Sequence, residues 1–108
     1  MDDPYKEIDG VILQWVEDHE FTLFTHTQGH AGTFRNVYLG SADECCQIWI
    51  DPPENGTVGV HAADVESRND APMRADWTAP IPVLASTLDL AVGHVRTWLA
   101  RQHHGRQA

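Results

Sequence analysis

A helical repeat in the last third of the chain constrains the fold more than any other feature. Apolar residues recur at steps of three and four over residues 84–99, which indicates one apolar stripe along a helix of about five turns. Prolines precede it, and Ser86-Thr87-Leu88-Asp89 has the form of a capping box. We therefore predict a helix that begins between residues 82 and 87 and ends near residue 102, followed by a flexible tail over about 103–108. A helix with such an apolar stripe must bury it, and we expect it to pack on a sheet.

The N-terminus carries a second helical repeat. Tyr5, Ile8, Ile12 and Trp15 recur at helical spacing after an Asp-Pro pair, while the opposite face is mostly acidic. These features predict a helix over about residues 4–18 with one buried side.

Four segments of strand character lie between the two helices. They are Phe21–His26, Thr33–Leu39, Cys45–Ile50 and Thr57–Val65. Because the connections are short, with Asn55-Gly56 as a tight turn in one of them, we expect an antiparallel meander. A fifth, edge strand near Met73–Thr78 is the alternative, with 66–75 otherwise a surface loop. At 108 residues the chain predicts a single α+β domain, 1–108, in which two helices and a four- or five-stranded antiparallel sheet form two layers.

The two-residue period of the strands predicts one aliphatic and one aromatic face of the sheet. The aliphatic set is Phe21, Leu23, Val37, Leu39, Cys46, Ile48, Ile50, Val58, Val60 and Ala62. The opposite face of the sheet includes Phe24 and Asn36. Its aromatic part, which we call the aromatic face, consists of Phe34, Tyr38, Trp49 and His61. If both helices pack on the aliphatic face, the aromatic face is left for a partner, for a second copy of the chain, or for a covering loop that would make it a second small core.

The charge of the chain excludes several classes of partner. Sixteen acidic residues against seven basic ones give a net charge of −9, and the acids concentrate in residues 1–20 and 41–80. Nucleic-acid and membrane-surface binding both depend on Lys and Arg, so neither partner is expected. The acidic Met-Asp-Asp-Pro start is unlike a secretion signal, which predicts a cytoplasmic protein.

No pattern of catalytic or metal-binding residues is evident. Cys45 and Cys46 are adjacent and are interpreted as reduced thiols. His26 and His30 have a spacing that does not bring two imidazoles together at a strand end, so we predict no metal and no cofactor. Catalytic residues are not assigned, and the chain is not expected to be an enzyme.

One resemblance to a known family is carried by the last third. Ala79-Pro80-Ile81-Pro82, followed by Leu88-x-x-Ala91-Val92 and Trp98-Leu99, together with the acidic N-terminal helix and the strand meander, resembles the small α+β immunity proteins of bacterial polymorphic toxin systems. The resemblance implies a protein without catalytic activity that binds and blocks one toxin domain.

We therefore expect a small acidic inhibitor of a basic partner protein, such as a toxin or a nuclease-like effector. The candidate partner-binding residues are Asp43, Glu44, Trp49, Asp51, Glu54, Asp64, Glu66 and Asp70. The alternatives are a domain that uses its aromatic sheet face to bind a small molecule or to form a homodimer and, third, a cryptic enzyme.

Overall fold

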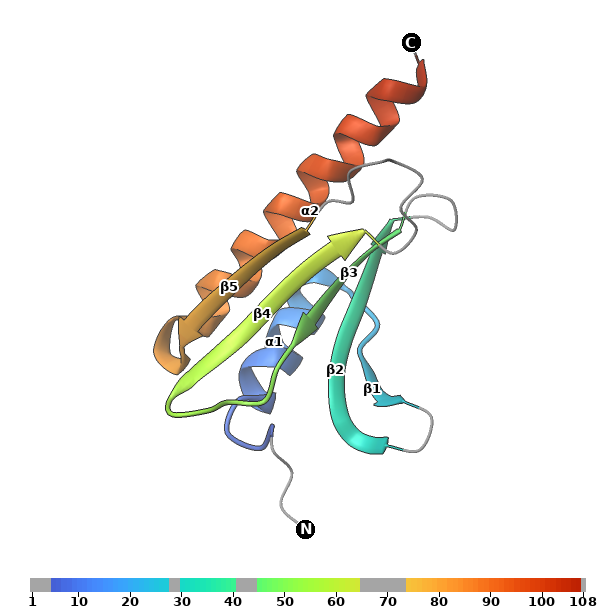
Figure 1. Ribbon diagram of the computed structural model, residues 1–108. Coiled ribbons are helices and arrows are strands. Elements are labelled where there is room, and N and C mark those ends of the chain that lie inside the picture. Colours follow the sequence, from blue (N-terminus) through green and yellow to red (C-terminus); the bar gives the residue numbers. More distant parts are fainter. Residues whose placement is uncertain (1–4, 28–29, 41–44, 65–73, 108) are drawn as a thin grey trace.

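Two helices enclose a run of five strands in the chain. The computed structural model describes residues 5–27, 30–40, 45–64 and 74–107, and the side chains of 25–34 and 101–107 lie outside that description. The elements are α1 (Asp9–His19), β1 (Phe24–Thr27), β2 (His30–Gly40), β3 (Cys45–Ile50), β4 (Thr57–Asp64), β5 (Arg74–Pro80), the short 3₁₀ helix η1 (Ile81–Val83) and α2 (Leu84–Gln107) (Figure 1).

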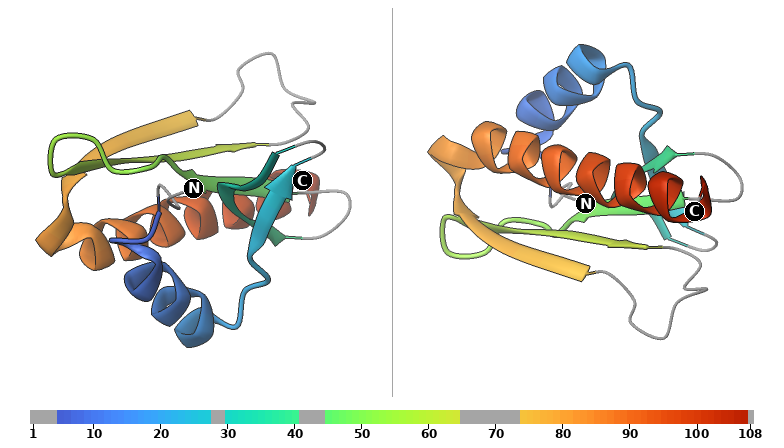
Figure 2. Two further views of the ribbon diagram at one scale, coloured as in Figure 1. Left: turned by 90° about the horizontal axis from the view of Figure 1, so that it is seen from below. Right: turned by 90° about the horizontal axis from the view of Figure 1, so that it is seen from above.

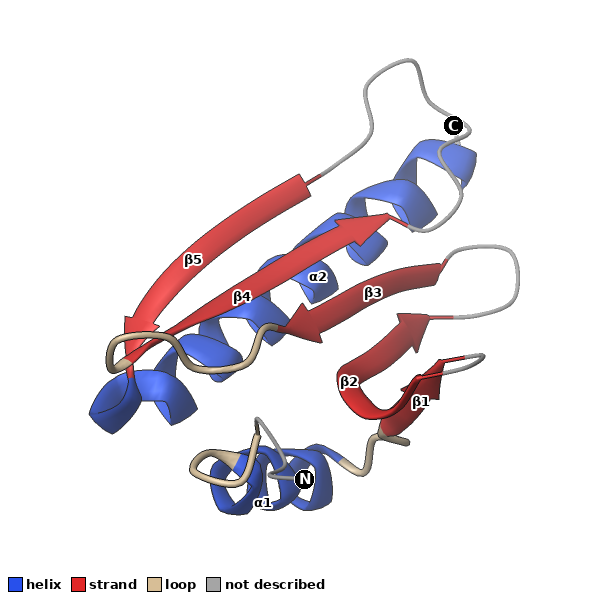
Figure 3. Cartoon of the chain, turned by 60° about the horizontal axis from the view of Figure 1, so that its bottom comes forward, coloured by secondary structure: helices blue, strands red, loops and turns tan. Residues whose placement is uncertain are grey.

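The strands form one antiparallel sheet in the order β1-β2-β3-β4-β5, which is a simple meander. Both helices lie on the same side of this sheet, with the long α2 running beneath β3, β4 and β5 (Figure 2). The predicted two-layer α+β architecture is thus confirmed, and the alternative fifth strand is present as β5. Figure 3 shows β5 at the edge of the sheet, with α2 passing behind the neighbouring strand β4.

The core lies between the sheet and the helices. Its sheet side consists of the predicted aliphatic set from β2, β3 and β4, all buried, with Phe21 and Leu23 partly buried at the margin. Its helix side is Ile8, Ile12, Trp15, Leu84, Leu88, Ala91, Val92 and Val95. The two-residue period therefore identified the inner face of the sheet correctly.

The first helix is shorter than predicted, because residues 5–8 form a turn. The carbonyl of Tyr5 accepts hydrogen bonds from the backbone N–H groups of Ile8 and Asp9, at 2.9 and 2.8 Å. The Tyr5 hydroxyl donates to the carbonyl of Ile50 at 2.8 Å, which ties the turn to the end of β3. The apolar spacing continued through Tyr5 because this residue is also buried in the core.

The second helix begins inside the predicted range but lacks the predicted cap. Pro82 lies in η1, which leads directly into Leu84, so Ser86 lies inside the helix. Thr87 donates its hydroxyl to the carbonyl of Val83, the last residue of η1, at 3.2 Å. The helix also continues to Gln107, so residues 103–107 belong to α2. Neither α1 nor α2 is apolar enough over a sufficient length to span a membrane.

The first two strands differ from their predicted limits. β1 begins at Phe24 rather than Phe21, and β2 begins at His30 rather than Thr33. The pairing of Thr27 with His30 makes this connection a short hairpin. β3 has the predicted limits.

An ion pair joins the sheet to α1. Arg35 of β2 is 5% exposed and donates from Nε to Oδ1 of Asp9 at 2.8 Å, and from Nη2 to Oδ2 at 3.1 Å. Its guanidinium lies 4.3 Å from the centre of the Tyr5 ring. A buried cation is tolerated here because its carboxylate partner is bidentate.

Candidate partner-binding surface

The sheet face opposite the helices carries a row of residues that crosses all five strands. The register pairs Phe24 with Asn36, Asn36 with Trp49, Trp49 with His61, and His61 with Asp76. Because paired residues share a face, these five side chains lie side by side on the face that neither helix covers. We call them the open-face row.

His61 lies between two carboxylates. Its Nδ1 is 2.6 Å from Oδ1 of Asp76, and its Nε2 is 2.6 Å from Oδ2 of Asp51, which follows β3 directly. An ionised carboxylate can only accept, so both ring nitrogens must carry a proton to make both bonds. The geometry therefore favours an imidazolium.

The electrostatics agree with that assignment. Burial of the ring lowers the pKa of His61, but the hydrogen bonds and charges of Asp76 and Asp51 outweigh it, so the pKa is raised above 6.5. The pKa of Asp76 is lowered, first by its hydrogen bond from Arg74 and then by that from His61. Asp76 is thus ionised near neutral pH, as the imidazolium requires.

A glycine makes room for this arrangement. A Cβ atom on Gly59 would lie 2.5 Å from Oδ2 of Asp51 and 3.1 Å from Nε2 of His61. The backbone of Gly59 also accepts a hydrogen bond from the N–H of Asp51 at 2.9 Å. The missing side chain at position 59 is therefore what lets Asp51 reach His61 across the strand.

Trp49 is the largest side chain of the row. Its ring stacks on His61 with centroids 5.1 Å apart and an interplanar angle of 20°. The guanidinium of Arg74 lies 5.4 Å from the Trp49 ring centre and donates to Asp76 at 3.2–3.3 Å. Trp49 is partly exposed and is held in one orientation by two cationic groups.

The β1 and β2 end of this face is more apolar. Phe24 and Tyr38 meet edge to face with centroids 5.4 Å apart, and they are 45% and 43% exposed. Exposed aromatic pairs of this kind are unusual unless something covers them. Phe34, predicted on the same face, lies in β2, but its side chain is outside the described set.

Asn36, the second member of the row, is fully buried. Within the described part of the chain neither its amide nitrogen nor its amide oxygen has a hydrogen-bond partner. Its register neighbours are Phe24 and Trp49. A buried amide without hydrogen-bond partners destabilises the folded state, so an asparagine at this position suggests a functional role.

The predicted acids are only partly brought together. Asp51 is half-exposed and contacts His61, which in turn lies beside Trp49. Glu54 is exposed in the turn that joins β3 to β4. Asn55 and Gly56 both have positive φ there, which confirms the predicted Asn-Gly turn.

Asp64 lies on the other face of the sheet. It pairs with Cys46, which is in the core, so it is not adjacent to Trp49. Asp43, Glu44, Glu66 and Asp70 lie outside the described residues.

Arg74 was missed by the sequence reasoning, whereas Asp76 was expected among the acids after the fourth strand that could converge around Trp49. Asp76 and Arg74 lie on β5 and face the same way as His61 and Trp49. The alternation of polar and apolar residues over 74–80 was the available signal, but the pairing register with β4 could not be obtained from it.

The thiol of Cys46 shows no sign of activation. The pKa of Cys46 is raised to about 11 by burial, by the charge of Asp64 and by Cys45. A protonated thiol in the core is a poor nucleophile. Among the described residues, no three His, Cys, Asp or Glu side chains are arranged to hold a metal ion.

Comparison with known proteins does not assign a function, so the assignment depends on the geometry of the surface. No family model, curated protein or solved structure matches this chain.

Proposed function

We propose that this protein is a small inhibitor of the immunity type, which binds a basic partner protein through the open sheet face. The observation that carries the proposal is the open-face row, in which aromatic rings and half-exposed carboxylates lie together on the face that neither helix covers. A basic toxin or nuclease-like effector is the partner class that fits an acidic chain.

Trp49 supplies the anchor of the proposed contact. Tryptophan is enriched among residues that dominate binding energy, because a large ring loses much water contact for little conformational entropy. Here His61 and Arg74 already fix the ring. A pre-oriented anchor reduces the entropy lost on binding.

Carboxylates around the anchor supply hydrogen-bond acceptors. Asp51 and Asp76 are 50% and 49% exposed, so each keeps capacity to accept hydrogen bonds from a partner's Lys or Arg. His61 and Arg74 balance the charge of these two carboxylates locally, so the attraction for a basic partner comes from the chain as a whole, which stands at −9. We therefore expect the overall charge to speed association and the local contacts to determine the lifetime of the complex.

The test compares baits substituted on the open sheet face with a control substituted elsewhere. The wild-type protein, Trp49→Ala, Asp51→Asn/Asp76→Asn and the control Glu7→Gln/Glu17→Gln are used to capture partners from a lysate, followed by mass spectrometry. The control removes two exposed acids from the α1 region and leaves the sheet unchanged. A basic protein held by the wild type and the control, but lost from the two open-face variants, is the expected result.

Activity and salt dependence complete the test. The captured protein should lose its own activity when the wild-type protein is added, and the association rate should fall as salt increases. Equal capture of the same proteins by all four baits, or an association rate indifferent to salt, would remove the basis of the proposal.

A second candidate is small-molecule binding by the same face, and Asn36 is the observation that favours it. The amide has both polar atoms unpartnered but no exposed surface, so a planar ligand that offers a donor and an acceptor would reach it only if the side chains that cover it move aside. Native mass spectrometry of the purified protein should then show added mass that is lost in Asn36→Leu. Identical masses for the two proteins, apart from the substitution, would exclude a co-purifying ligand.

A further inference from the structure

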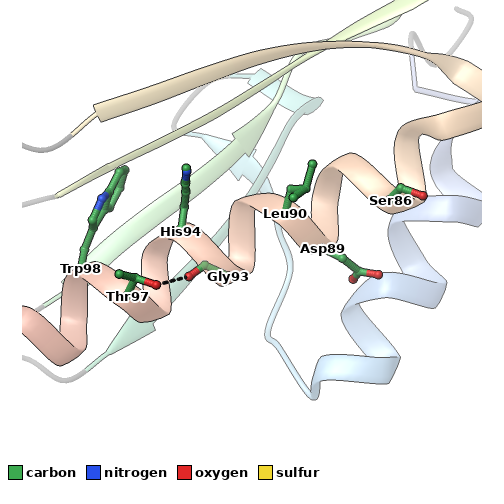
Figure 4. A pocket seen from close by; sticks show the side chains of 7 residues that line it. All are labelled: Ser86, Asp89, Leu90, Gly93, His94, Thr97 and Trp98. Carbon is green, nitrogen blue, oxygen red and sulfur yellow. Dashed lines mark hydrogen bonds between the residues drawn. The ribbon is translucent and has the colours of Figure 1, made fainter.

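A groove runs along the outer side of α2, on the helix layer and away from the open-face row. Figure 4 shows Leu90, His94 and Trp98 pointing to one side of the helix, with Asp89, Gly93 and Thr97 beside them. Leu90 lines this groove and is 61% exposed, the highest value among the large hydrophobic side chains that the structure describes. We propose that this groove is a homodimer interface, in which α2 of a second copy packs antiparallel against α2.

The charges of the helix make the groove complementary to itself. Asp89 and Arg96 are seven residues apart, which is about two turns, so they lie on one flank of the helix, with Gly93 between them. A two-fold axis beside Gly93 brings Asp89 of each copy to Arg96 of the other, so the pair forms twice. Both residues are exposed, and Arg96 makes no ion pair with a described residue.

The other flank of the groove is complementary in shape and polarity. Leu90 and Thr97 are also seven residues apart, so the same two-fold axis places Leu90 of one copy against Thr97 and His94 of the other. The His94 ring lies 5.2 Å from Trp77 of β5 and 6.1 Å from Trp98, which fixes this flank against the sheet. The exposed leucine therefore meets a preformed surface.

Gly93 allows the two helices to approach closely. A Cβ atom at this position would have no heavy atom within 4 Å, so the space over the glycine is open in the single chain. A second helix can occupy that space with its own Gly93, as small residues at a crossing point permit. Acid, base, leucine and glycine thus all satisfy one two-fold arrangement, which is the argument for a second copy of this chain over a different protein.

The dimer goes beyond the proposed function and leaves it intact. The groove is on the helix side of the sheet, so both open-face rows of a dimer point outward. Each copy could then bind a partner independently. Loss of the dimer and loss of partner binding are therefore separable outcomes.

Charge reversal tests the arrangement directly. The molar mass of the full chain in solution is measured by light scattering and analytical ultracentrifugation for the wild type, Asp89→Arg and Arg96→Asp. The wild type should be a dimer, and each variant alone should be a monomer because like charges then face each other twice. An equimolar mixture of the two variants should form a heterodimer, since every pair is again of opposite charge.

The controls separate this interface from other causes. Asp89 also accepts a hydrogen bond from His19 at 3.0 Å, but the mixture contains Asp89→Arg as well, so regained dimerisation cannot come from that bond. Glu17→Arg and Lys6→Asp reverse exposed charges elsewhere and should stay dimeric, and circular dichroism checks the fold of each variant. A monomeric wild type at every concentration, a dimer unaffected by either reversal, or a mixture that stays monomeric would overturn the proposal.

Discussion

Gly59→Ala is the substitution that examines the carboxylate and imidazole arrangement most closely. The new methyl group would lie 2.5 Å from Oδ2 of Asp51 and 3.1 Å from Nε2 of His61, the two atoms whose own separation is 2.6 Å. Gly59 does not have a positive φ, so an alanine meets no backbone strain. Space alone reserves this position for glycine.

The magnitude follows from which atom moves. The carboxylate of Asp51 is half-exposed, so it can swing into water and give up its bond to His61. A hydrogen bond to a charged group contributes about 1.5–3 kcal/mol when protected, and about 1 kcal/mol with this degree of exposure. Alanine returns about 0.4–1 kcal/mol by restricting the unfolded chain. The free energy of unfolding should therefore change by less than about 1 kcal/mol.

The pKa of His61 is the readout that responds. Loss of Asp51 as a partner should lower the pKa measured by NMR titration of the imidazole, because one of the two interactions that raise it disappears. In an Asp51→Ala background the oxygen is absent, so Gly59→Ala should be stabilising by about 0.4–1 kcal/mol. An unchanged pKa of His61, together with the same stability change in both backgrounds, would show that position 59 does not control the contact.

Four further predictions concern stability. His61 has a folded pKa above its unfolded value of 6.5, so its contribution to the free energy of unfolding is complete below pH 6.5 and is lost as the pH rises through the folded pKa. Denaturant titrations across that pH window should therefore show a loss of stability in the wild type that is absent in His61→Gln. Trp15→Ala removes a ring that is 3% exposed and should cost about 3–5 kcal/mol, measured by urea unfolding. Asn36→Leu should instead raise the free energy of unfolding by about 1–3 kcal/mol, because two unpartnered polar atoms are removed; a large loss would mean that the amide is satisfied. Asp9→Ala leaves the buried guanidinium of Arg35 without its carboxylate and should cost about 3 kcal/mol, whereas Asp9→Glu should recover part of it.

The sequence predicted those parts of the fold that depend on local period. Val58, Val60 and Ala62 alternate with polar residues, and all three are buried as expected. Trp15 was expected in the core and is there, whereas Trp98 is only partly buried at the margin. The two residues differ because the apolar stripe on α2 continues beyond the part of the helix that packs on the core, and Trp98 lies in that continuation.

The parts that could not be predicted depend on long-range contacts. Tyr5 continued the helical spacing, but its hydroxyl bond to Ile50 holds it in a turn. Asp76 lies beside His61 only through the register between β4 and β5, which a single strand does not encode. Asn36 has the alternation of a surface position, yet it is fully buried, with Phe24 and Trp49 as its register partners on the two adjacent strands.

The four tryptophans permit one measurement that tests the open face as the binding surface. Each indole N–H gives a separate NMR signal, and Trp49 lies on the open face while Trp15, Trp77 and Trp98 pack on the helix side. The signals are followed at constant protein concentration while the basic partner identified by capture is added. The proposed function predicts that the Trp49 signal shifts and saturates while the other three stay in place. Shifts at Trp77 and Trp98 with an unchanged Trp49 would place the partner on the helix side and contradict the account.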